Sequence, residues 1–68
     1  MPAVSQFSTA ENFTKVNAAI DQVTTAIQEA TIAQQAGIPG AAQVLSNAQD
    51  ALSRLQLFRQ TYFPTGAP

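Results

Sequence analysis

The chain has 68 residues, a formal net charge of −1 and 10% charged residues, whereas soluble domains carry about 25%. A chain of this length forms one domain at most, and it has no cysteine or histidine to hold a disulfide or a zinc ion. Three basic residues are too few for the basic stripe of a nucleic-acid-binding surface, so we expect no nucleic-acid contact.

Targeting signals are absent from the sequence as it stands. Residues 1–9 contain no basic cluster and no apolar run, and no segment approaches the roughly 20 apolar residues of a membrane span. We therefore expect a soluble protein that is made in a cytoplasm and has no membrane contact.

The first predicted element is an extended arm over residues 1–8, because this stretch has no helical period. Ser8-Thr9-Ala10-Glu11 has the S-x-x-E form of a capping box, with Ser8 as the expected N-cap and Glu11 reaching back to it. A helix is predicted over 9–36, a range that contains neither glycine nor proline.

A turn is predicted over 37–40, where the sequence reads Gly37-Ile38-Pro39-Gly40. Gly37 suits the left-handed position after a helix, and Ile38 suits the next position, from which its side chain folds back on the last turn. Pro39 cannot continue a helix. The turn residues are Gly37, Pro39 and Gly40, and a second helix is predicted over 41–62.

Apolar residues recur at spacings of three and four in both helices, which keeps one face apolar and favours packing along the whole length. The predicted fold is an all-α, coiled-coil-like antiparallel hairpin of two helices, with Phe58 near Val16 and Tyr62 near Phe13. The second stripe comprises Ala41, Val44, Ala48, Ala51, Leu55, Phe58 and Tyr62. The expected hairpin core comprises Phe13, Val16, Ile20, Val23, Ile27, Val44, Leu52, Leu55, Phe58 and Tyr62.

An extended tail is predicted over 63–68, because the residue before Pro64 is pushed out of helical geometry. All five aromatic residues fall at the open end of the hairpin. They form either a small core that closes this end or, for Phe7 and Phe63, anchors that dock into another molecule. The expected partner interface comprises Phe7, Ile32, Leu57, Phe63 and Pro64, with Phe63 as the anchor of the tail.

No group of residues is arranged for chemistry. The chain has no phosphate-binding glycine loop, and its four carboxylates are spread along the sequence. Glu11–Lys15 and Asp50–Arg54 have the i,i+4 spacing of exposed ion pairs that support helices. We therefore expect no enzyme activity, cofactor, metal or small-molecule substrate.

The function expected from these features is structural. Two helices that share one seam bury too little apolar surface to offset the entropy of ordering the chain, and uncharged polar faces are cheaper to bury than charged ones. The expected partners are protein subunits of a larger symmetric assembly, including copies of this chain. The expected setting is a virus particle, as a minor head, neck, tail or internal protein of a bacteriophage.

Two alternatives remain open. A short helical hairpin with a proline-containing turn resembles in outline the needle proteins of bacterial type III secretion systems, which implies a filament subunit. The chain departs from them because Gly37-Ile38-Pro39-Gly40 replaces their P-x-x-P turn and Phe63-Pro64 ends the second helix. The other alternative is a small inhibitory or regulatory hairpin that binds one partner.

Overall fold

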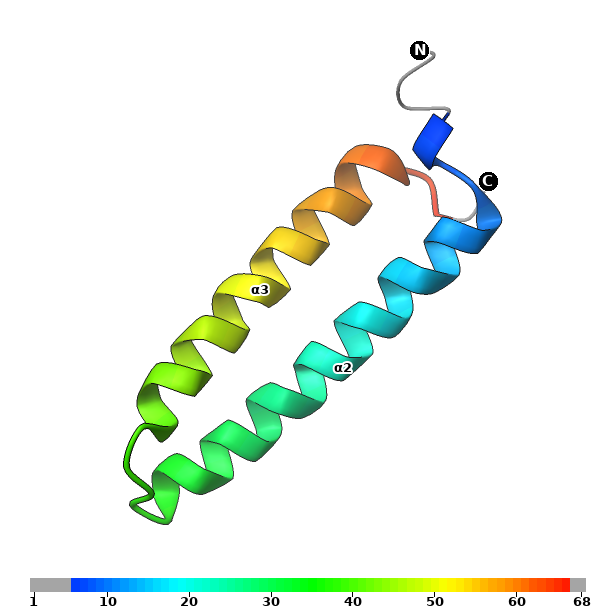
Figure 1. The fold of residues 1–68 in the computed structure, drawn as a ribbon. Coiled ribbons are helices and arrows are strands. Elements are labelled where there is room, and N and C mark those ends of the chain that lie inside the picture. Colours follow the sequence, from blue (N-terminus) through cyan, green and yellow to red (C-terminus); the bar gives the residue numbers. More distant parts are fainter. Residues whose placement is uncertain (1–5, 67–68) are drawn as a thin grey trace.

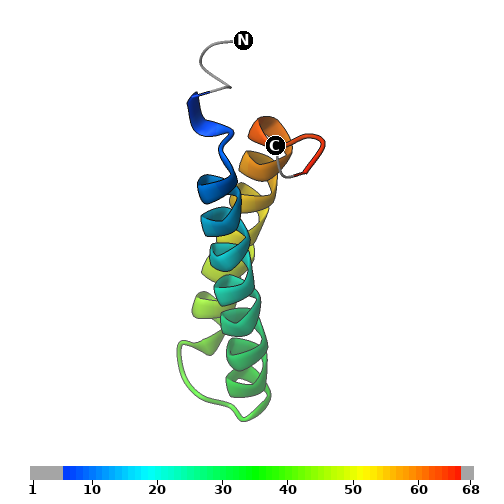
Figure 2. The same cartoon turned by 90° about the vertical axis from the view of Figure 1, so that its right-hand side faces the viewer.

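Two long antiparallel helices dominate the computed structural model, which describes residues 6–66 (Figure 1). Helix α2 spans Ala10–Gln35 and helix α3 spans Ala41–Tyr62, so the predicted all-α hairpin is confirmed. The molecule measures 48 × 15 × 15 Å with a radius of gyration of 14.8 Å, whereas a compact chain of this length has about 11 Å. The helices lie side by side along their whole length in both views (Figures 1 and 2).

The N-cap of α2 is Thr9, and the prediction of Ser8 at this position is wrong. Thr9 has extended backbone with φ −101° and ψ 158°, and its hydroxyl accepts a hydrogen bond from the backbone N–H of Asn12 at 3.1 Å. Ser8 instead donates its hydroxyl to the carbonyl oxygen of Tyr62. Both residues can cap a helix, and the contact with α3 decides between them.

The N-terminal arm also differs from its prediction. Residues 6–7 have helical backbone, and the side-chain amide of Asn12 donates to the carbonyl oxygen of Phe7 at 3.1 Å. These residues are therefore folded onto the start of α2 instead of extending from it. Residues 1–5 of the predicted arm lie outside the described residues.

The turn after α2 is the predicted left-handed cap at Gly37, which has φ +77°. Two hydrogen bonds of 3.0 Å close it, from the N–H of Gly37 to the carbonyl of Gln34 and from the N–H of Ile38 to the carbonyl of Ala33. This pair of bonds defines a Schellman motif. The helix ends here because glycine reaches this conformation without the strain of a side chain.

A second reversal follows immediately and begins α3. The N–H of Ala41 donates to the carbonyl of Ile38 at 3.2 Å, and Gly40 has φ +85° and ψ −10°. Proline in the second position and glycine with positive φ in the third are the signature of a type II turn. Both glycines of the turn are therefore held in left-handed backbone.

The C-terminal segment turns back instead of extending, which corrects the predicted tail. Phe63 ends α3 by donating its N–H to the carbonyl of Arg59 at 2.7 Å, and Gly66 donates to the carbonyl of Phe63 at 3.1 Å. Pro64 thus follows the first residue of a four-residue turn, a position that proline favours. Residues 67–68 lie outside the described residues.

The seam of α3 is rotated relative to the predicted stripe. Val44 and Phe58 were expected in the core, but their exposed fractions are 55% and 39%. Leu45 and Arg59, each one position further along the chain than Val44 and Phe58, are half-buried instead. The remaining predicted core residues are buried or half-buried: Phe13, Val16, Ile20, Val23, Ile27, Leu52, Leu55 and Tyr62.

Burial within the hairpin is slight. Of the described residues only Ile20, Ala30, Ala41 and Phe63 are buried, and none of the described side chains is fully enclosed. The chain exposes 4824 Å², whereas a compact monomer of this size is expected to expose about 4,100 Å². One layer of contacts between two helices therefore leaves much apolar surface in water.

Candidate interaction surface

Aromatic side chains close the open end of the hairpin. The rings of Phe13 and Phe63 lie 5.2 Å apart between centroids, and Phe7 meets Tyr62 edge-on at 5.7 Å. The rings of Phe58 and Tyr62, one turn apart on α3, are tilted relative to each other with their centroids 4.5 Å apart. These centroid separations lie within the range of favourable aromatic pairs.

Phe63 belongs to the interior of this chain and is only 5% exposed. The prediction that it anchors the tail on a neighbouring molecule is therefore wrong, because a side chain enclosed by its own fold has little surface left to offer. Phe63, not Tyr62, is the partner of Phe13, one residue from the predicted register. Phe7 keeps an exposed fraction of 48%, and Pro64 is exposed in the turn over residues 63–66.

Ile32 and Leu57 are exposed to 66% and 63%, as expected for positions away from the seam. Their helical positions place them on the outward faces of α2 and α3, among polar neighbours. Whether another subunit covers them stays a prediction.

The two sides of the seam differ in chemistry. On one side, which we name the polar side, Arg59 donates a hydrogen bond to the side-chain oxygen of Asn17 at 2.9 Å across the two helices. Thr24 and Thr31 follow Asn17 at intervals of seven residues and therefore lie along the same side of α2. Their hydroxyls donate to the backbone carbonyls of Ile20 and Ile27 at 2.8 and 2.7 Å.

On the opposite side, which we name the apolar side, each helix presents one line of apolar side chains. No charged residue lies between these two lines. Ala33 of α2 and Val44 of α3 line one groove, and residues seven positions apart share a helix face. Because of this spacing, two lines run along the same side of the hairpin. The apolar side comprises Ala19, Ala26, Ala33, Val44, Ala51 and Phe58.

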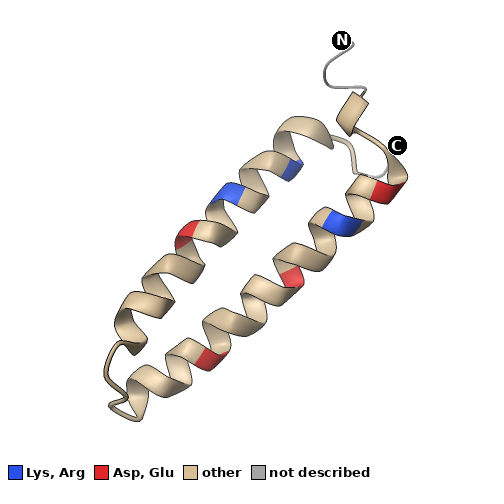
Figure 3. Cartoon of the chain, in the orientation of Figure 1, with Lys and Arg blue, Asp and Glu red and all other residues tan. Residues whose placement is uncertain are grey.

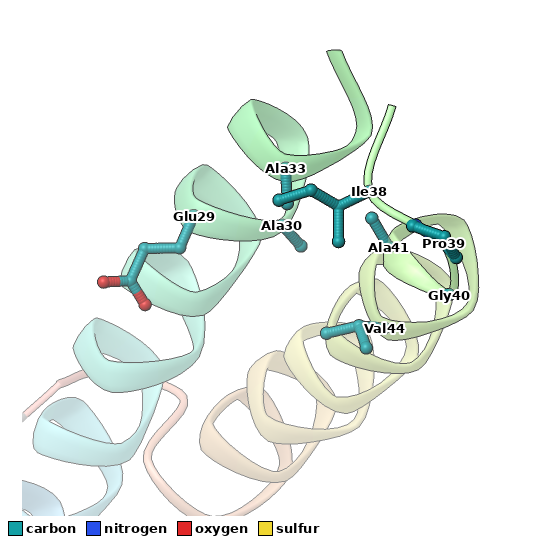
Figure 4. A pocket seen from close by; sticks show the side chains of 8 residues that line it. All are labelled: Glu29, Ala30, Ala33, Ile38, Pro39, Gly40, Ala41 and Val44. Carbon is teal, nitrogen blue, oxygen red and sulfur yellow. The ribbon is translucent and has the colours of Figure 1, made fainter. Parts of the chain in front are cut away.

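The groove lies at the turn end of the apolar side and has a volume of about 350 Å³. Ala30 and Ala41 form its floor, and Ile38 overhangs it from the turn (Figure 4). Glu29 stands at its rim with the carboxylate directed away from the other lining side chains. The lining is almost wholly aliphatic, so the groove suits an apolar side chain and offers little to a polar ligand.

Charged residues are sparse and mostly paired locally. Lys15 lies 3.6 Å from Glu11 and Arg54 lies 3.2 Å from Asp50, both as exposed i,i+4 pairs. Within the part of the chain that the structure describes, the turn end carries no charge between Glu29 and Asp50 (Figure 3). Ion pairs of this kind support a helix by only a few tenths of a kcal/mol.

Helical threonines satisfy their own hydroxyl donors. Thr14, Thr25 and Thr61 donate to the carbonyl four residues earlier at 2.8–3.1 Å, as Thr24 and Thr31 do. A donor that is already paired loses no hydrogen bond when another surface displaces water from it. Another protein can therefore cover these faces without breaking a hydrogen bond that a threonine hydroxyl donates.

Within residues 6–66, acidic side chains do not gather into a metal-binding cluster, and neither helix combines the length and apolar character of a membrane span. Comparison with known proteins finds no family model, no curated protein and no solved structure that matches this chain. The surface itself therefore carries the functional argument.

Proposed function

We propose that this chain is a non-enzymatic structural subunit that packs against copies of itself or against larger subunits of a symmetric assembly. The observation that supports it most directly is the imbalance between burial and exposure. Few described residues are buried, while large apolar side chains stay exposed along both helices, in the turn and before α2. Apolar side chains that gather on one face, as on the apolar side, mark interaction surfaces in proteins.

Low charge supports the same proposal. Uncharged polar side chains dominate the outward faces, and their burial avoids the desolvation penalty of lysine and glutamate. A closed particle of many subunits uses such surfaces on several sides at once. The finer setting that we propose is a virus particle, in particular a bacteriophage head, neck, tail or internal component.

The native mass of the complex that holds the chain tests this function. The chain, tagged at its C-terminus and made at its natural level, is released gently and measured by size-exclusion chromatography with light scattering. A particle of defined mass with many copies is the expected result.

Other outcomes contradict the proposal in different ways. A polymer without fixed length would contradict a closed particle and support the alternative of a filament subunit. A one-to-one complex with a single larger protein would favour the regulatory hairpin, and a free, folded monomer would remove the structural role altogether.

A further inference from the structure

We propose that a second copy of this chain covers the apolar side, in an antiparallel two-fold arrangement that forms a four-helix bundle. In this arrangement α2 lies over α2 of the second copy and α3 lies over its α3. The inference rests on the proposed function, because it names the first partner that the structural subunit binds. Two-fold packing requires one surface to be complementary to itself, and three observations meet this requirement.

The first observation is the order of side chains along α3. Val44, Ala51 and Phe58 follow one another at intervals of seven residues, with the smallest side chain in the middle. When this line meets an antiparallel copy of itself at Ala51, each Val44 faces Phe58 of the other copy. Small residues at the crossing point let two helices approach closely, and the larger side chains then fill the space on either side.

The second observation is the groove at the turn end. Val44 lines it together with Ala33 and Ile38, so the arrangement that pairs Val44 with Phe58 also brings Phe58 of the second copy to this groove. Phe58 is 39% exposed and Ile38 is 55% exposed. The ring and the groove thus supply an apolar knob and an apolar hole at each end of the same interface.

The third observation is the charge pattern of α2. Lys15, Gln22 and Glu29 lie at intervals of seven residues, beside the three alanines that α2 contributes to the apolar side. Gln22 lies at the middle of Ala10–Gln35. Full antiparallel overlap of α2 with its copy therefore places each Lys15 opposite Glu29 of the other molecule. The Lys15 side chain is 69% exposed beside Glu11, so its ammonium group is accessible to a second carboxylate.

Both helices have nearly the same midpoint along the hairpin. The contacts of Phe13 with Phe63 and of Asn17 with Arg59 place Gln22 and Ala51 within about 5 Å of each other along the axis, at 1.5 Å per residue. One two-fold axis can thus serve both helix pairs. A face of 48 by 15 Å offers on the order of 700 Å², close to the ~800 Å² per partner of a standard interface.

Cysteine cross-linking tests the two-fold axis directly, because the natural chain has no cysteine. In the full chain, Ala51→Cys places two thiols at the axis, where mild oxidation is expected to give a covalent dimer. Ser53→Cys is the matched control, because it lies two residues away on the outward face of α3. Circular dichroism of both reduced variants checks that the hairpin is retained.

Charge exchange tests the pairing of α2. Lys15→Glu and Glu29→Lys are each expected to weaken self-association about tenfold at low salt, since each puts like charges at two contacts. A mixture of the two single variants restores both contacts and is expected to form a heterodimer. The double variant restores the homodimer, and Asp21→Lys on the outward face of α2 is the control that leaves association unchanged.

A dimer that cross-links through Ala51→Cys and not Ser53→Cys, with rescue in the mixed charge variants, supports the inference. If the chain self-associates but shows neither the selective cross-link nor the charge rescue, this arrangement is overturned. The copies would then pack through another face. A chain that stays monomeric up to hundreds of micromolar also overturns it. The native-mass measurement then decides separately whether the structural role survives through other subunits.

Discussion

Backbone conformation at two glycines sets the direction of the whole hairpin. Gly37 and Gly40 have φ +77° and φ +85°, and nothing lies within 4 Å of a Cβ added at either position. A substitution there would meet no steric obstacle from neighbouring atoms, so its cost reflects the left-handed backbone alone. Both glycines are therefore expected to resist a side chain to a similar degree, because both have positive φ.

Gly37→Ala and Gly40→Ala are each expected to lower the free energy of unfolding by about 1 kcal/mol. Thermal unfolding followed by circular dichroism, at one fixed protein concentration, measures the change. Gly37→Asn and Gly40→Asn should recover part of the loss, because asparagine tolerates left-handed backbone. A loss confined to Gly37→Ala would contradict equal strain at the two sites.

The cap of α2 provides a second test at the same scale. Thr9→Ala removes the hydroxyl that accepts the N–H of Asn12 and is expected to cost about 1 kcal/mol of stability. Thr14→Ala is the matched control, because its hydroxyl only donates back to Ala10 within the helix and alanine has the higher helix propensity. Helix content and melting temperature report both changes. Equal losses from the two variants would show that Thr9 does not act as the cap.

Packing between elements depends on the aromatic cluster at the open end. Phe63 lies just outside α3, yet it is buried against Phe13 of α2, and its carbonyl accepts the bond that closes the final turn. The turn over residues 63–66 therefore holds the open ends of the two helices together through the contact of Phe63 with Phe13. This role explains why the tail folds back on the hairpin instead of extending from it.

Phe63→Ala is expected to destabilise the hairpin by about 3 kcal/mol, as for other large-to-small changes at buried phenylalanines. Phe7→Ala removes the same ring from a half-exposed position and is expected to cost about 1 kcal/mol, the worth of an aromatic pair. Urea unfolding at one protein concentration compares the two. If Phe63→Ala lowers the free energy of unfolding no more than Phe7→Ala does, Phe63 does not hold the two helices together at the open end.

The whole molecule is a rod whose stability should depend on its own concentration. Binding that occurs only in the folded state stabilises that state in proportion to the logarithm of partner concentration. From low micromolar to hundreds of micromolar, we expect helix content and melting temperature to rise together. Circular dichroism and sedimentation on the same samples test this, and a melting temperature that is constant while the mass stays monomeric would contradict it.

The short-range features of this fold could be read from the sequence. The bounds of α3, the left-handed cap at Gly37 and the pairs Glu11–Lys15 and Asp50–Arg54 depend on residues a few positions apart. Local steric and hydrogen-bonding rules therefore suffice for them. The antiparallel hairpin follows from the same rules, because a four-residue turn leaves two long amphipathic helices no other close arrangement.

Only the tertiary structure decided how α3 is rotated, which residue caps α2 and where Phe63 lies. Val44, Ala51 and Phe58 form a more hydrophobic stripe than Leu45, Leu52 and Arg59, which lie one position further along α3, yet all three residues of the second stripe are half-buried. The hydrogen bond between Arg59 and Asn17 and the burial of Phe63 select one rotation, and the bond from Ser8 to Tyr62 leaves Thr9 as the cap. Each of these choices depends on residues far apart in sequence, so the physical reason is a contact that exists only after the helices have met.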